Sequence, residues 1–123
     1  ISFLELKEYE EQKVTDLSFG IQKRVELARA LALNPKVLLL DEPAGGLNPQ
    51  ETEHLMEIIK AIRDKRGITI FLVEHDMRLV MGLSDRICVL HFGVKIAEGT
   101  PEVIQKDEDV VKAYLGTTYD FGD

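Results

Sequence analysis

Two short apolar segments on either side of an amphipathic helix pattern place the strongest constraint on how this chain folds. Val37–Asp41 (VLLLD) and Ile68–Val73 (ITIFLV) are too short for helices and are apolar at successive positions. This pattern is typical of parallel strands that are buried on both faces. We therefore expect an α/β fold in which a mostly parallel sheet is flanked by helices on each side.

The segment between these strands has the signals of a well-capped helix. Asn48 suits the N-cap, Pro49 the first helical position and Glu51 the partner position of a capping box. Gly67 marks the end of the helix. The helix should bury one apolar stripe, formed by Leu55, Ile58, Ile59 and Ile62.

Weaker patterns predict the other elements. Ile1–Thr15 should be helical, and Ser18–Leu33 should form a helix that buries the positions Ile21, Val25, Ala28 and Ala32. A β-hairpin should turn at Phe92–Gly93, with Cys88 in the core. The strands of the hairpin should be Arg86–His91 and Val94–Glu98. Short helices are expected at Met77–Leu83, from Thr100-Pro101 onward, and at Val110–Leu115.

Composition excludes several classes of protein. The 123 residues carry a net charge of −7, whereas broad nucleic-acid binding needs a basic face, so no nucleic acid is expected as a partner. No apolar run approaches the ~20 residues of a membrane-spanning helix, and there is no signal-peptide pattern. The single cysteine rules out an internal disulfide and fits a reducing compartment.

Polar residues follow both predicted strands directly. Asp41 and Glu42 end the first strand, and Glu74 and His75 follow the second. Parallel sheets bind ligands beyond the carboxyl ends of their strands. Pro43 should keep Glu42 extended, so that the two adjacent carboxylates point to opposite sides. One carboxylate can then hold Mg²⁺, the other can orient a water, and the imidazole can reach a phosphate; the alternative is a solvated turn.

A second group of residues lies at the start of the helix predicted from residue 18. Ser18 suits the N-cap, and Gly20 allows another group to approach closely. Free amides and a hydroxyl at a helix N-terminus can bind an anion. The alternative is an ordinary serine cap on an amphipathic helix.

The order and spacing of these segments resemble the ATP-binding subunits of ABC transporters. "LSFGI" (Leu17–Ile21) followed by Gln22 resembles the signature motif, and "VLLLDE" (Val37–Glu42) resembles Walker B. "GGLN" (Gly45–Asn48) resembles the D-loop, and His75 in "VEHD" the switch histidine. The surrounding text, such as "EHDMRLVMGLSDRI", is similar to the branched-chain amino-acid importer type.

The resemblance implies a role for each matching residue. Asp41 would serve Mg²⁺, Glu42 would be the general base, and His75 would contact the γ-phosphate of ATP. The remaining residues would contact a nucleotide held mainly by the other subunit, or cross the dimer interface near it. They are Ser18, Gly20, Gln22, Gly45, Gly46 and Asn48.

The pattern G-x-x-x-x-G-K-[S/T], which wraps the phosphates in this family, does not occur in the sequence. We therefore expect the carboxyl-terminal part of an ATPase subunit, inactive alone and with weak nucleotide binding. Residues 1–16 would be a remnant of a helical subdomain, 17–116 the carboxyl-terminal part of the ATPase domain, and 117–123 a loose tail. Without its phosphate-binding strand, the sheet should expose an apolar edge.

The resemblance also implies partners and a location. A second ATPase subunit, membrane-embedded permease subunits and, indirectly, a solute-binding protein are expected, at the cytoplasmic face of the inner membrane. The alternatives are a related ATPase for lipopolysaccharide export or urea uptake, and an ABC ATPase that moves no solute. The isolated chain could also act only as an interaction module.

Overall fold

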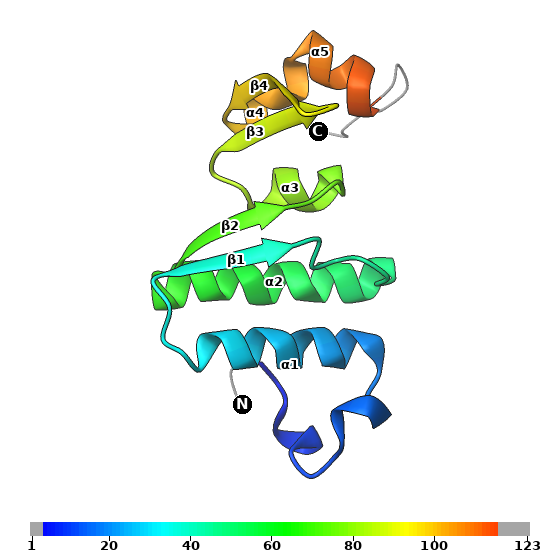
Figure 1. The fold of residues 1–123 in the computed structure, drawn as a ribbon, viewed down its shortest axis with the longest axis vertical. Helices are drawn as coiled ribbons and strands as arrows, with labels where there is room; N and C mark the ends of the chain where they lie inside the picture. Colours follow the sequence, from blue (N-terminus) through cyan, green and yellow to red (C-terminus); the bar gives the residue numbers. More distant parts are fainter. Residues whose placement is uncertain (1–3, 116–123) are drawn as a thin grey trace. The chain divides into compact units, whose positions relative to one another are not determined.

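The computed structural model describes residues 4–115, and these residues form two compact units that divide after Leu79. The predicted helix Met77–Leu83 is present as α3, and the boundary between the units lies within it. No helix of the described residues is long and apolar enough to cross a membrane. The other elements of unit 1 are the 3-10 turns Lys7–Tyr9 and Val14–Asp16, α1 (Phe19–Leu31), β1 (Val37–Asp41), α2 (Pro49–Arg66) and β2 (Thr69–Val73) (Figure 1).

The sheet of unit 1 consists of β1 and β2, which pair in parallel. The register runs from Val37 opposite Thr69 to Asp41 opposite Val73. α2 makes the crossover between the strands, so the predicted β-α-β unit is confirmed (Figure 1). Because the last residues of the two strands, Asp41 and Val73, are paired, the polar segments that follow the strands begin side by side.

α2 has the capping and burial that its sequence predicts. The Asn48 side chain accepts from the Glu51 amide at 2.8 Å, and the Glu51 carboxylate accepts from the Asn48 amide at 3.1 Å. Gly67 ends the helix with φ of 63°, and its amide bonds to the Arg63 carbonyl. The predicted stripe is buried, and Ile62 is fully inaccessible.

Replacing Asn48 by Ala should lower the free energy of unfolding by about 1 kcal/mol, because the Glu51 amide in the first turn of α2 loses its side-chain acceptor. Chemical denaturation monitored by circular dichroism measures the change. Gln50→Ala, at an exposed position in the same turn, is the matched control and should be near neutral. An Asn48→Ala variant as stable as the control would contradict this assignment of the cap.

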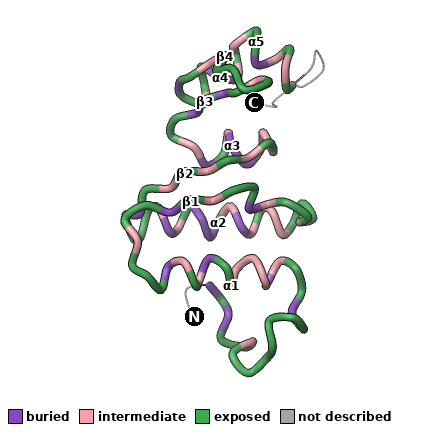
Figure 2. The backbone as a smooth tube through the Cα atoms, viewed as in Figure 1, coloured by how far each residue is buried: buried purple, intermediate pink, exposed green. Residues whose placement is uncertain are grey.

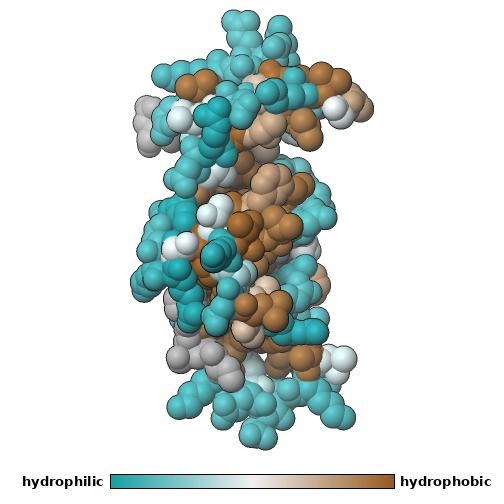
Figure 3. Space-filling view, turned by 60° about the vertical axis from the view of Figure 1, so that its left-hand side comes forward, coloured by the Kyte–Doolittle hydropathy of each residue, from teal (hydrophilic) through white to brown (hydrophobic). Residues whose placement is uncertain are grey.

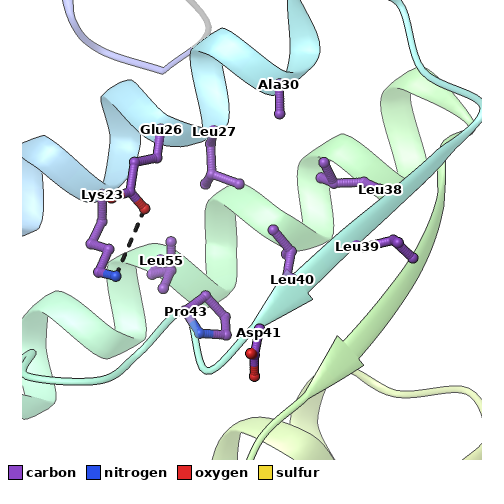
Figure 4. A pocket seen from close by; sticks show the side chains of 10 residues that line it. All are labelled: Lys23, Glu26, Leu27, Ala30, Leu38, Leu39, Leu40, Asp41, Pro43 and Leu55. Carbon is purple, nitrogen blue, oxygen red and sulfur yellow. Dashed lines mark ion pairs between the residues drawn. The ribbon is translucent and has the colours of Figure 1, made fainter.

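The prediction that both strands are buried on both faces is wrong for the described structure. Leu38 and Leu40 point towards α2, whereas Leu39 points to the other side of β1 (Figure 4). Leu39 is 72% exposed and Phe71 on β2 is 63% exposed. Apolar side chains therefore reach the surface among polar ones (Figure 3). Leu39 and Phe71 are partners in the register, so one face of this sheet carries adjacent exposed apolar side chains.

Replacing Leu39 and Phe71 together by Lys should reduce self-association of the chain, because exposed apolar sheet faces favour association in water. Sedimentation velocity over a range of concentrations measures the effect. The matched control replaces Val14 and Leu33, two exposed apolar residues outside the sheet, by Lys. Equal behaviour of the two double variants would show that the sheet face has no special role.

The prediction of a helix in Ile1–Thr15 is also wrong for residues 4–15, which contain only short 3-10 turns. Leu4 and Leu6 are buried, while Glu5 between them has φ of 57°, which no right-handed helix allows. The Glu5 carboxylate lies 3.0 Å from His54 Nε2 and 3.7 Å from Arg24 Nη1. Tertiary contacts to α1 and α2 thus override the local helix preference.

α1 is present with the predicted Ser18 cap and buries Ile21 as predicted, but its other buried positions differ from the prediction. Its buried residues are Ile21, Leu27 and Leu31, whereas Val25 and Ala28 are intermediate and Ala32 is exposed. The purple segments of Figure 2 show this alternation of burial along the helix. The two leucines offer more apolar area than the alanines, and burying them lowers the free energy further.

Unit 2 contains the predicted hairpin and short helices. β3 (Ile87–His91) and β4 (Val94–Gly99) pair antiparallel, and the turn has positive φ at Phe92 and Gly93. Cys88 is exposed, contrary to the prediction, because alternation along β3 buries its two neighbours instead. Thr100 caps α4 (Pro101–Lys106), and Asp107 caps α5 (Glu108–Val110), which continues as a π turn, Val111–Leu115.

A cluster of exposed charged side chains lies on the hairpin. Glu98 accepts from Lys95 Nζ at 3.0 Å and from Arg86 Nε at 3.3 Å. These hydrogen bonds, that from Lys95 first, lower the pKa of Glu98. The predicted helix end at Gly116 and the predicted tail 117–123 lie outside the described residues.

Candidate functional site

The carboxyl ends of β1 and β2 bring the two predicted polar segments together. Glu42 follows β1 and His75 follows β2, and Glu42 Oε1 lies 3.8 Å from His75 Nε2. Both side chains are largely exposed. A carboxylate and an imidazole therefore share one open position beyond the sheet, where a ligand can reach both.

The backbone of Glu42 is not extended, contrary to the prediction. Its φ is 45°, which is uncommon for a residue with a side chain. The Glu42 amide donates to the Val73 carbonyl at 2.7 Å, and the Glu42 carbonyl accepts from the Gly45 amide at 3.0 Å. The chain thus turns directly after Asp41, so the strand alternation does not continue through Glu42. The ladder bond to β2 and the following turn outweigh the preference that Pro43 imposes.

Asp41 is the last residue of β1, and its side chain is exposed. Among the described residues its carboxylate makes no hydrogen bond or ion pair. It borders a pocket of about 200 Å³ between α1 and β1 (Figure 4), which is also lined by Lys23, Glu26, Leu27, Ala30, Leu38, Leu39, Leu40, Pro43 and Leu55. A free carboxylate at a strand end fits Mg²⁺, which takes one or two protein carboxylates and keeps waters and substrate phosphates as its other ligands.

Residues 4–115 contain no cluster of three or more histidine, cysteine or acidic residues that could hold a metal ion by themselves.

The start of α1 has the predicted cap, but one candidate side chain is engaged elsewhere. Ser18 Oγ accepts from the Ile21 amide at 3.4 Å. Gln22 Nε2 donates to the Leu17 carbonyl at 3.0 Å, so its amide group folds back on the preceding backbone. A Cβ at Gly20 would lie 3.4 Å from Glu51 Cδ, so this glycine faces the first turn of α2.

The loop between β1 and α2 packs against the same helix start. Gly46 has φ of 78°, and a Cβ there would lie 2.9 Å from Phe19 Cε1. Lys23 Nζ lies 5.2 Å from the centroid of the Phe19 ring. The Gly45 amide donates a hydrogen bond to the Glu42 carbonyl. The Asn48 side chain caps α2 by accepting from the Glu51 amide. Phe19 thus joins the signature segment to the D-loop segment, a contact that the sequence did not reveal.

The predicted residues therefore fall into two groups within unit 1. Asp41, Glu42 and His75 lie at the carboxyl ends of the strands. Ser18, Gly20, Gln22, Gly45, Gly46 and Asn48 lie at the starts of α1 and α2 and in the loop before α2. The loop after β1 connects the two groups through the hydrogen bond between Gly45 and Glu42.

Glu74 is a residue of this region that sequence analysis did not single out for a role. Its carboxylate accepts hydrogen bonds from backbone amides of both loops, those of Ala44, His75 and Asp76. The only signal in the sequence is an acidic residue directly before the histidine. The tertiary pairing of β1 and β2 is needed to see that it reaches the other loop.

Comparisons with known proteins identify families, relatives and solved structures that this chain resembles. The model of the ABC transporter family matches residues 1–45, and that of the branched-chain amino acid ATP-binding cassette transporter family matches residues 94–120. The chain is 50% identical over 111 residues to the high-affinity branched-chain amino acid transport ATP-binding protein LivG of Escherichia coli K12, covering 90% of this chain and 44% of LivG. It is 41% identical over 103 residues to the lipopolysaccharide export system ATP-binding protein LptB of Haemophilus influenzae, covering 84% of this chain and 42% of LptB.

A solved structure has the same fold. The ADP conformation of MJ1267, an ATP-binding cassette of an ABC transporter, superposes with a TM-score of 0.83 at 33% identity, over 94% of this chain and 46% of that chain. The chain thus spans less than half the length of the relatives that it matches. Motif order, family matches and fold agree, and the chain belongs to the ATP-binding domain family of ABC transporters.

Proposed function

We propose that this chain supplies the carboxyl-terminal part of a transport ATPase that powers the import of branched-chain amino acids. The observation that carries the proposal is the approach of Glu42 and His75 to 3.8 Å at the carboxyl ends of two parallel strands. Phosphoryl transfer requires one group that positions the attacking water and another that binds the transferred phosphate. Glu42 and His75 are exposed at the same position and can fill these two roles.

The proposed mechanism assigns one role to each side chain. Glu42 accepts the proton of the attacking water as general base, and His75 donates a hydrogen bond to the γ-phosphate of ATP. Asp41 would hold Mg²⁺. The bound ion would supply positive charge that neutralises the phosphate oxygens. The residues of the chain thus orient the water and the reacting phosphate.

The second group of residues would act across a dimer. The signature residues Ser18, Gly20 and Gln22 would contact a nucleotide that a second ATPase subunit holds, and Gly45–Asn48 would cross the interface. Phe19 at the start of α1 is exposed, and the first amides of a helix have no acceptor within the helix, which supports an anion site there. Permease subunits in the membrane, and through them a solute-binding protein, complete the proposed assembly at the cytoplasmic face of the inner membrane.

The choice of solute rests on the comparisons. The identity to LivG is 50%, against 41% to LptB, and the family model that matches residues 94–120 is that of branched-chain amino acid transporters. Lipopolysaccharide export is therefore the second candidate.

A chimera tests the ATPase proposal. This chain would replace the 111 residues of E. coli LivG that it matches, and ATP hydrolysis and Mg-ATP binding would be measured by phosphate release and calorimetry. We expect binding and hydrolysis by the chimera, and no binding heat from the chain alone. A chimera that folds and binds ATP but never hydrolyses it would refute the proposed activity.

Uptake of labelled leucine tests the solute. E. coli cells that lack LivG and carry the chimera should regain uptake. An active chimeric ATPase that restores no uptake would contradict the branched-chain assignment while leaving the ATPase assignment intact.

A further inference from the structure

Glu74 is bonded to both loops of the candidate site. Its Oε1 accepts from the Ala44 amide at 3.1 Å, in the loop that follows β1. Its Oε2 accepts from the amides of His75 at 3.0 Å and Asp76 at 3.2 Å, in the loop that follows β2. One carboxylate thus ties together two segments that are thirty residues apart in the sequence.

The segment tied down by Oε1 contains the strained residue of the site. Glu42 has φ of 45°, a backbone conformation that costs free energy for any residue with a Cβ. Such a conformation persists only where surrounding contacts hold it. Glu42 is held before the turn by its bond to Val73 and within it by the bond from Gly45. The Ala44–Glu74 bond is a side-chain hydrogen bond that joins this turn to the loop carrying His75.

The bonds of Glu74 also argue against a direct chemical role. Both of its oxygens are engaged by backbone N–H groups, and a charged acceptor makes such hydrogen bonds stronger than neutral ones. The carboxylate therefore serves the two loops. Glu42 and His75, in contrast, are exposed and have their side chains directed to one another.

We propose that Glu74 is a positioning residue that holds the general base Glu42 and the phosphate-binding His75 in register. The hydrogen bonds by which Glu74 joins the two loops are called the clamp. The effect of the clamp on catalysis rests on the proposed ATPase function, whereas the existence of the clamp does not. When the carboxylate is lost, the turn after β1 relaxes towards an unstrained backbone, and Glu42 moves away from His75.

The clamp is tested first by hydrogen exchange of backbone amides, measured by nuclear magnetic resonance in this chain. In Glu74→Ala, the amides of Ala44, His75 and Asp76 should all exchange faster than in the unaltered chain, because each loses its acceptor. Glu57→Ala, at an exposed position of α2, is the control and should leave the three rates unchanged. Unchanged exchange at Ala44 in Glu74→Ala would overturn the proposal.

A pair of variants of the LivG chimera then tests the catalytic consequence. Glu74→Gln offers one acceptor oxygen in place of two, so it can serve Ala44 or the His75 side, but not both. We expect kcat to fall about 10- to 100-fold while the KM for ATP stays within about twofold. Glu57→Gln, at an exposed position of α2, is the matched control and should behave as the unaltered chimera.

The outcomes separate the clamp from the proposed function. A chimera that binds ATP without hydrolysing it refutes the ATPase proposal, and the exchange rates of the three amides still decide the clamp. An active chimera in which Glu74→Gln matches Glu57→Gln in kcat overturns the positioning role. Intact folding of both variants is checked by their circular dichroism spectra and melting curves.

Discussion

Replacing Glu42 by Gln in the LivG chimera should reduce kcat for ATP hydrolysis by about 10²- to 10⁴-fold, because the amide cannot accept the proton of the attacking water. Binding of Mg-ATP should persist, since this side chain acts on the water in the proposed mechanism. Glu42 is exposed, so the substitution removes a charge without leaving a buried gap. Single-turnover phosphate release measures the rate, and calorimetry measures the binding.

Glu57→Gln is again the control, because it removes the same charge from an exposed position outside both loops. It should keep full activity. A Glu42→Gln variant that hydrolyses ATP as fast as this control would show that another group activates the water, and the assignment of the general base would fall.

Replacing Gly46 by Ala should have the largest effect on stability among the substitutions considered. A side chain at φ of 78° costs about 1–2 kcal/mol. The new methyl group would also lie 2.9 Å from Phe19 Cε1, and displacing the ring adds about 1 kcal/mol. Chemical denaturation should therefore show a loss of about 2–3 kcal/mol in the free energy of unfolding.

Gly67→Ala is the matched control for this prediction. Gly67 also has positive φ, 63°, but a Cβ there would meet no atom within 4 Å. It should show only the backbone cost. In a Phe19→Ala background, the extra cost of Gly46→Ala should disappear, as expected when two residues are coupled by direct contact. Equal losses for the two glycine variants would mean that the Phe19 ring gives way freely.

Local signals in the sequence were strong enough to predict α2 and the hairpin. The cap residues Asn48 and Glu51 and the terminal Gly67 act within one or two turns of backbone, so their hydrogen bonds depend little on the rest of the molecule. The same holds for the turn at Phe92–Gly93.

The faces of the elements were harder to predict, because burial depends on what packs against them. An all-apolar strand reads as buried on both sides, yet Leu39 and Phe71 are exposed in the described residues. Cys88 was misplaced because its neighbours compete for the same core. The helix predicted before residue 16 does not form in residues 4–15, where Leu4 and Leu6 are buried and Glu5 pairs with His54 of α2.

The β-α-β unit, the caps of α1 and α2 and the polar residues at the strand ends could be predicted from the sequence, because they follow from short-range spacing. How these residues meet depends on contacts between distant segments. The parallel register sets Asp41 beside Val73, which brings Glu42 to His75 and lets Glu74 reach Ala44. Hydrogen bonds between segments thirty residues apart depend on strand pairing, and no local pattern encodes them.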